Sequence, residues 1–215
     1  MYDVRDNNTY IVRKLADGNC WMSENLKLNL GTPSAPVTVK RAQYNSTYTE
    51  DWTPTGTGGS NAAEPMNSNT KTPAPNGNYY YSWYAATAGS GTSAQTNTEA
   101  EYSICPSGWK LPANYTIDQT KSYGSLTNSY GFTTDGANNS QNHVVQLESA
   151  PLNFARSGNY GNGSLTNNGT SGYYWSSTAY TGATYAYYFL YHTSYTYPQR
   201  NGIKYLGFNV RCVAQ

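Results

Sequence analysis

Charged side chains are scarce in this sequence. Lys, Arg, Asp and Glu make up 12% of the 215 residues, against about 25% in ordinary globular proteins. The net charge of +1 gives no electrostatic reason to expect nucleic acid or an anionic membrane surface as a partner. No apolar run approaches the ~20 residues that a membrane helix needs, so we expect no direct membrane insertion by this chain.

Residues that bind metals or act as nucleophiles are also few. The sequence has two histidines, His143 and His192, and its three cysteines form no C-x-x-C pair. This set is too small for a zinc or a three-histidine iron site. No Ser, His and Asp are marked out as a catalytic triad. We therefore expect no metal, no cofactor and no enzyme activity.

We expect no secretory leader within these residues, because Met1 leads directly into the polar stretch YDVRDNNTY. Asn, Thr, Ser, Gly and Tyr take the place of the missing charges. Such a polar but nearly uncharged surface suits an extracellular or virion protein. We expect an extracellular, cell-surface or phage-virion location, with the export signal supplied outside this chain.

Tyrosine, by contrast, is concentrated near the C-terminus, where residues 173–215 hold ten of the 23. Most of these tyrosines stand among Ser, Thr, Ala and Gly. A hydrophobic core favours Leu, Ile and Val, and a surface that stays free in solution favours Lys and Glu. Tyrosine among small polar residues is typical of a binding surface, because its rigid ring gives contact area at low entropic cost.

The chain length fits one domain over residues 1–215. The stretches TYIVRKL, ADGN and CWMSENLKL predict an N-terminal hairpin. Residues 31–75 predict a long polar surface loop, with TPTGTGGSN (53–61) as its least structured part. A short helix is expected over 79–88, and a weak helix at best over 113–126. Near the end we expect strands over 173–177, 185–192 and 207–213, with a surface loop between the last two.

Four ordered motifs resemble the Fibrobacter succinogenes major paralogous domain: DVRDNNTYIVRKLADGNCWMSENL, YYYSWYAATA, CPSGWKLP and the closing YYWSST…GFNVRCV. That family is related to the formylglycine-generating enzymes. The resemblance implies an α+β protein with a C-type lectin fold, which has twisted antiparallel strands, two helices and long irregular loops. The acidic-aromatic helix that follows WKLP in the superfamily is replaced here by ANYTIDQTKSYGSL.

The tail is also similar to the variable proteins of diversity-generating retroelements, which share this fold. In those proteins the randomised side chains are displayed on the ligand-binding face. The resemblance implies a receptor or adhesin with a variable region over 173–213, whose partner is a protein or glycan on another cell or host surface. The alternative is a non-diversified bacterial surface domain of the Fibrobacter type, serving as an adhesin, cell-wall or carbohydrate-binding module.

The expected ligand-binding residues lie between the motifs YYWSST and GFNVRCV, in the window 179–206. They are Tyr180, Thr181, Thr184, Tyr185, His192, Ser194, Tyr195, Tyr197, Arg200 and Tyr205. We expect the tyrosines of this set, with His192 and Arg200, to form one contiguous exposed patch. Alternation within 185–192 makes both faces of that strand aromatic-rich, so one face is a candidate for a ligand. We expect Tyr173, Tyr187 and Phe189 to lie largely in the core.

The tryptophans are predicted to be mainly structural. Trp21, Trp83, Trp109 and Trp175 lie within the family-like motifs and are expected to be buried anchors. Trp52 stands alone in the polar loop, as either a loop anchor or an exposed contact.

The three cysteines leave one without a partner inside the chain. Cys105 and Cys212 flank motifs of the resemblance, and alternation turns Cys212 inward. We expect these two to form a disulfide. Cys20 is then free, or pairs with a cysteine upstream of Met1.

Overall fold

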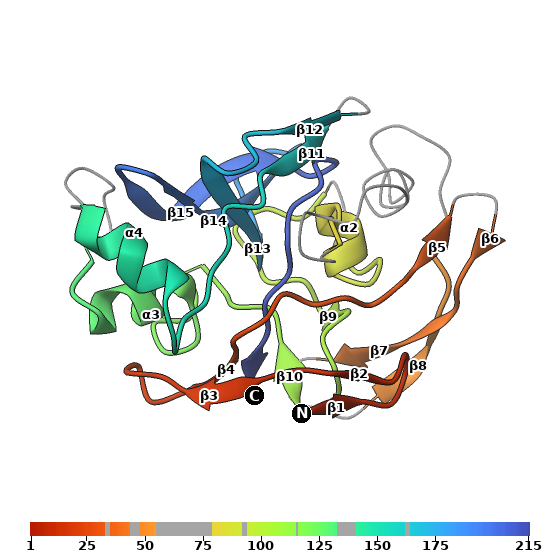
Figure 1. Cartoon of the computed structure of the whole chain (residues 1–215). Coiled ribbons are helices and arrows are strands. Elements are labelled where there is room, and N and C mark those ends of the chain that lie inside the picture. Colours follow the sequence, from red (N-terminus) through yellow and green to blue (C-terminus); the bar gives the residue numbers. More distant parts are fainter. Residues whose placement is uncertain are drawn as a thin grey trace.

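The computed structural model describes residues 1–32, 35–43, 48–54, 79–91, 94–114, 116–132, 141–161 and 164–215. Over these ranges the chain is an α+β protein, made mostly of short antiparallel strands with three short helices (Figure 1). The helices are α2 (Trp83–Ala86), α3 (Tyr123–Ser129) and α4 (Gln141–Glu148). Most of the stretch 53–61, expected to be the least structured part, lies outside the described residues.

One four-stranded sheet joins the two ends of the chain. Its order is β10-β16-β4-β3, and its strands are β3 (Val12–Lys14), β4 (Cys20–Met22), β10 (Trp109–Lys110) and β16 (Val213–Ala214). The predicted N-terminal hairpin is confirmed, because β3 pairs antiparallel with β4. Strand β16 lies between β4 and β10, so the last residues close the sheet that the first hairpin opens (Figure 1).

The described part of residues 31–75 forms hairpins, which corrects the prediction of a continuous surface loop. Their strands are β5 (Gly31–Thr32), β6 (Ala35–Pro36), β7 (Val39–Gln43) and β8 (Tyr48–Trp52). Strand β9 (Tyr102–Ser103), from later in the chain, joins them. Strand β7 pairs with both β8 and β9. Val39 and Ala42 are buried in the core, and these two anchors give an otherwise polar segment a reason to fold.

Trp52, which the sequence left open, is an anchor of this layer. Its side chain is half-buried and packs against the core. A Cβ added at Gly89 would lie 2.6 Å from the indole Nε1, and Gly89 has a φ of +75°, so a glycine is required beneath the ring. Trp52 therefore fixes β8 against the turn that follows α2.

The C-terminal sheet has the order β13-β14-β15, with β13 (Ser171–Ala179), β14 (Tyr185–His192) and β15 (Thr196–Ile203). Strand β14 has the predicted bounds. Strand β15 lies where a surface loop was expected, which is a correction. Its Pro198 is tolerated because β15 is an edge strand. The strand expected over 207–213 is replaced by isolated bridges, such as Phe208 with Tyr81, until β16 begins at Val213.

Two clusters of buried residues lie on the two sides of the C-terminal sheet. The first, here the Trp175 cluster, contains Trp83, Trp175, Tyr188 and Phe208. The second, here the Phe189 cluster, contains residues of β4, β13, β14, α3 and α4. Among them are Trp21, Tyr123, Leu126, Val144, Leu147, Tyr174, Phe189 and Tyr191. Three of the four predicted tryptophan anchors are fully buried, whereas Trp109 is half-buried.

Helices α3 and α4 were poorly predicted from the sequence. The weak helix expected over 113–126 corresponds to α3, which begins later, where Ser122 caps it by accepting a hydrogen bond from the Ser125 N–H at 3.0 Å. Helix α4 was not predicted. Among the residues of α4 whose burial is described, 143–148, Val144 and Leu147 reach the core, so its apolar stripe is too narrow to identify.

The remaining strands form two small hairpins. They are β1 (Tyr2–Asp3) with β2 (Asn8–Thr9), and β11 (Asn159–Gly161) with β12 (Ser164–Thr166). Gly207, just beyond β15, bridges to Tyr160, so the β11–β12 hairpin is tied to the end of the C-terminal sheet.

Cys105 and Cys212 form the expected disulfide, with Cα atoms 6.0 Å apart and a sequence separation of 107. Both are fully buried in the Trp175 cluster. Cys20 is exposed and is the free cysteine of the described residues. The bridge therefore links the segment before β10 to the segment before β16.

Candidate functional site

The middle of the C-terminal sheet is core on both faces. Tyr188 and Leu190 of β14 pack into the Trp175 cluster, while Phe189 and Tyr191 pack into the Phe189 cluster. The expectation that one face of this strand is free for a ligand is wrong for its central residues. The physical reason is that α3 and α4 contribute side chains to the cluster on the second face.

Of the three aromatic residues assigned to the core, Phe189 is fully buried, whereas Tyr173 and Tyr187 are half-buried. The ring of Tyr173 lies 5.8 Å from that of Tyr188 and 5.0 Å from that of Phe208. Its hydroxyl accepts a hydrogen bond from the Asn167 side chain at 2.9 Å. Tyr173 therefore has its ring in the core and its hydroxyl at the surface.

Four of the predicted binding residues form a continuous row, here the β15 row, that runs from the end of β14 through the turn into β15: His192, Tyr195, Tyr197 and Arg200. The rings of His192 and Tyr195 are stacked, 4.5 Å apart and 7° from parallel. The rings of Tyr195 and Tyr197 are 5.2 Å apart. The Arg200 guanidinium carbon lies 5.1 Å from the centre of the Tyr197 ring, within the range of a cation–π contact.

Core packing and a turn hold the β15 row in place. Tyr195 and Tyr197 are half-buried and pack against the Trp175 cluster. The His192 N–H donates to the Tyr195 carbonyl at 2.8 Å, closing the turn between β14 and β15. The His192 ring nitrogen Nδ1 lies 2.9 Å from the Thr193 hydroxyl and 3.4 Å from that of the exposed Ser194. The row is therefore ordered before any partner arrives.

A second group lies at the other end of β14, where β13 turns into it. Tyr180 and Tyr187 make an edge-to-face contact at 5.1 Å, and the Tyr180 N–H donates to the Tyr185 carbonyl at 3.0 Å. Tyr185 is 40% exposed, and Thr181 is exposed with its hydroxyl 3.2 Å from the Asn97 amide oxygen. This β13–β14 turn group thus contains four of the ten predicted residues when the neighbouring Thr184 is counted.

Thr184 and Tyr205, the remaining predicted residues of this end, are both exposed. The Lys204 N–H donates to the Thr184 carbonyl at 2.9 Å, which places the β13–β14 turn next to the end of β15. Tyr205 is 41% exposed.

The single contiguous patch expected from the sequence is divided into these two groups. Tyr185 and Tyr187 alternate with Ala186 and Tyr188, so they point away from the Trp175 cluster on which the β15 row packs. The two groups also lie at opposite ends of an eight-residue strand. The prediction failed because it treated residues 193–206 as a loop, whereas β15 is a strand that fixes direction residue by residue.

Tyr188 lies next to the β15 row, although the sequence alone did not indicate this. It lies opposite Arg200 in the β14–β15 ladder. Burial raises the pKa of the Tyr188 hydroxyl to about 12, and the Arg200 guanidinium opposes this rise. Only the register of β15 reveals this pair.

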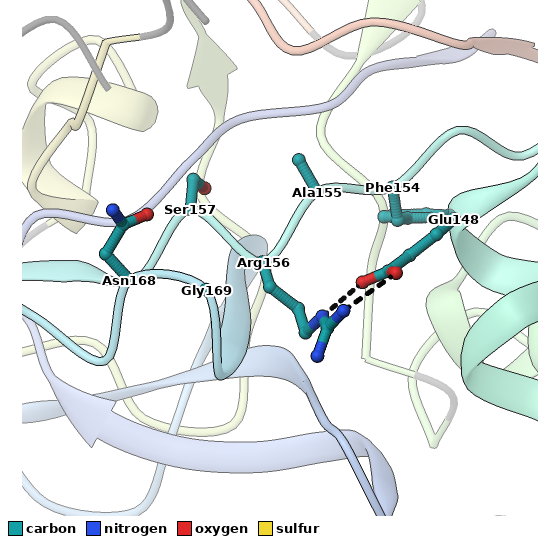
Figure 2. A pocket seen from close by; sticks show the side chains of 7 residues that line it. All are labelled: Glu148, Phe154, Ala155, Arg156, Ser157, Asn168 and Gly169. Carbon is teal, nitrogen blue, oxygen red and sulfur yellow. Dashed lines mark hydrogen bonds and ion pairs between the residues drawn. The ribbon is translucent and has the colours of Figure 1, made fainter. Parts of the chain in front are cut away.

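A surface cavity of 360 Å³ is formed by the end of α4 and the segments 154–157 and 168–169, and the sequence did not predict it. Its lining is Glu148, Phe154, Ala155, Arg156, Ser157, Asn168 and Gly169. Figure 2 shows Arg156 and Glu148 pointing toward each other at one end, with Ser157 and Asn168 at the other. The Arg156 Nη2 donates to Glu148 Oε2 at 3.1 Å, and Nε donates to Oε1, so both charged groups at the cavity are already paired.

A smaller cavity of 180 Å³ is lined partly by Arg211, which is 1% exposed. Its guanidinium donates to the Leu152 and Asn153 carbonyls and to the Asn25 side chain, and it lies 4.0 Å above the Phe154 ring centre. Burial lowers the pKa of Arg211. These contacts tie the GFNVRCV motif to the loop after α4, which indicates a structural role.

Within the part of the chain that the structure describes, no group of three or more His, Cys, Asp or Glu side chains is placed to hold a metal ion. Among the same residues no helix has the length and apolar character to cross a membrane. The β15 row and the β13–β14 turn group remain the candidate sites.

Comparisons with known proteins give no family for the chain. No protein-family model matches it, and neither a curated protein nor a solved structure matches it.

Proposed function

We propose that this chain is a ligand-binding domain with a C-type lectin fold, acting as a receptor or adhesin on a bacterial cell or phage and belonging to the variable proteins of diversity-generating retroelements. One observation carries the proposal. A single three-stranded sheet combines a fully buried aromatic framework with a half-exposed row of Tyr, His and Arg along its edge strand. Tyr and Arg are the residues most often found as binding hot spots.

The framework is made by the two motifs that bracket the window 179–206. Trp175, from YYWSST, donates its indole N–H to the Tyr81 carbonyl at 2.7 Å. Phe208, from GFNVRCV, stacks on Trp175 with ring centres 4.2 Å apart. These contacts hold the sheet from outside the window, so side chains at the exposed positions between the motifs can change without removing them.

The two cavities described above lie outside the predicted window. Their linings come from residues 23–27, 148–157, 168–169 and 211, all outside the window 179–206. The β15 row has a half-exposed aromatic surface instead. Such a surface suits a protein or glycan partner better than a small cofactor, which would favour an enclosing pocket.

Inspection of the encoding DNA tests the retroelement part of the proposal. We expect a nearby repeat that matches the codons of 173–213 except at adenines, together with a reverse transcriptase gene. Absence of both would remove the diversification and leave a fixed surface domain.

A cell-binding assay tests the binding part. Fluorescently labelled protein is applied to a panel of bacterial and host cells, and the apparent Kd is compared for wild type, Tyr195→Ala/Tyr197→Ala and Tyr2→Ala. Tyr2 is 57% exposed in β1, away from the C-terminal sheet, and is the matched control. We expect the double variant to bind about tenfold more weakly or worse, as loss of hot-spot residues does. Equal binding by all three proteins would contradict the proposal.

A further inference from the structure

The charge of the C-terminal third has one sign. No Asp or Glu follows Glu148, whereas Arg156, Arg200, Lys204 and Arg211 all do. Arg156 is paired with Glu148, and Lys204 and Arg211 are buried. Arg200 is the exposed member, and it takes part in none of the ion pairs formed among the described residues. Arg200 is therefore an exposed cation on the C-terminal sheet, and residues 149–215 contain no Asp or Glu that could pair with it.

Arg200 is held in a geometry that leaves donors available. Its guanidinium lies over the Tyr197 ring and opposite Tyr188 in the ladder. One of its N–H groups is hydrogen-bonded to the Tyr188 hydroxyl. A guanidinium carries five N–H donors, so others are left to form a two-pronged hydrogen bond with a carboxylate. The aromatic support also removes part of the flexibility that a free Arg side chain would lose on binding.

The surroundings of the β15 row favour a sugar over an apolar protein surface. The exposed aliphatic side chains all lie elsewhere in the described chain: Val4, Ile11, Val37, Ile117 and Val145. Within 149–215 the large exposed hydrophobic residues are Tyr185 and Tyr205 alone among those described. Ser194, in the turn of the row, and Gln199, next to Arg200, carry side chains that exchange hydrogen bonds with hydroxyl groups. Protein interface cores are instead enriched in buried apolar groups.

We propose that the β15 row binds an acidic polysaccharide, with a uronate or sialate carboxylate on Arg200 and a sugar ring packed on Tyr195 and Tyr197. This inference rests on the proposed binding function of the same surface and names its partner. The C–H face of a pyranose ring packs on an aromatic ring, while its hydroxyls reach the polar neighbours. The carboxylate supplies the negative charge that the last part of the chain lacks.

Biolayer interferometry with immobilised polygalacturonate, hyaluronate and polysialate tests this, with the carboxyl-reduced form of each as a neutral counterpart. We expect wild type to bind at least one acidic polymer, and its neutral form about tenfold or more weakly, since hydrogen bonds to charged groups are worth that much. Arg200→Gln should lose the same factor, Arg200→Lys should lose part of it, and Tyr2→Ala should lose nothing. Added salt should weaken binding to the acidic forms.

Three results would overturn the inference. They are no binding to any of the three acidic polymers, equal binding of acidic and reduced forms, and an Arg200→Gln affinity equal to wild type. Poly-glutamate is the protein-like arm, and binding to it as tight as to the polysaccharides would assign the row to acidic polypeptides instead. If cell binding depends on Tyr195 and Tyr197 but not on Arg200, the binding function stands and the acidic partner does not.

Discussion

The Cys105–Cys212 disulfide allows a stability prediction with a worked magnitude. The bridge closes a loop of 107 positions. In the chain-entropy model, cross-linking a loop of that length removes roughly 16 cal/mol/K from the unfolded chain, or about 5 kcal/mol at 25 °C. For a chain of 215 residues, each kcal/mol shifts Tm by about 2–4 °C, so loss of the bridge should lower Tm by about 10–20 °C.

Thermal melts of wild type, Cys105→Ala/Cys212→Ala and Cys20→Ala provide the measurement. Both bridged cysteines are fully buried, and alanine avoids placing a new polar group in the core. Cys20 is exposed, so its alanine variant should melt with wild type. Reduction of wild type with dithiothreitol should reproduce the melting point of the double variant.

Two results would refute this reasoning. Mass mapping of non-reduced peptides could find Cys20 bridged to either of the other cysteines, which would contradict the pairing. A loss of less than about 2 kcal/mol in the double variant would mean that the unfolded chain is already compact between the two positions, so the loop-entropy argument fails.

Two further predictions concern the C-terminal sheet. Trp175→Ala should lower the free energy of unfolding by about 3–5 kcal/mol, because loss of the fully buried indole leaves a cavity. Tyr205→Ala, at a 41% exposed position, should change it by no more than ~0.5 kcal/mol. Equal losses in urea unfolding would mean that Tyr205 is core. Burial lowers the pKa of Lys204 to about 8, so between pH 8 and 10 the unfolded chain binds more protons than the folded one and the free energy of unfolding should rise with pH. Lys204→Met should flatten that rise in urea titrations, and an unchanged slope would contradict the assignment.

Strand β14 was predicted with its full bounds because its eight residues are almost all aromatic or aliphatic, a strand signal that both buried faces reinforce. Strand β15 was missed because TYPQRNGI shows neither alternation nor apolar content. What makes it a strand is the ladder with β14, which pairs Tyr197 with Leu190 and Arg200 with Tyr188. A pairing partner is a tertiary feature, and the sequence of β15 alone carries no trace of it.

The candidate site was predictable in its residue types but not in its arrangement. Tyr195, Tyr197 and Arg200 were identified because Tyr and Arg among small polar residues indicate binding. Their grouping depends on which side of β15 each residue faces, and a predicted loop has no such sides. The cavity beside Arg156 was missed for a different reason: it is assembled from α4 and the segments around 154–157 and 168–169, which no single motif unites.

The edge position of β15 connects stability with the proposed display of side chains. An edge strand exposes unpaired backbone groups that invite pairing with other chains, and proline and charged residues are the usual protection. Pro198 removes one of these donors, and Arg200 places a charge on the same strand. The buried residues Trp175, Phe189 and Tyr191 lie in β13 and β14, so a substitution at the exposed Arg200 changes the surface without removing a core residue, whereas Tyr195 and Tyr197 also pack against the Trp175 cluster. Exposed side chains on such an edge strand can be replaced, and so bind a different partner, with the smallest loss of stability.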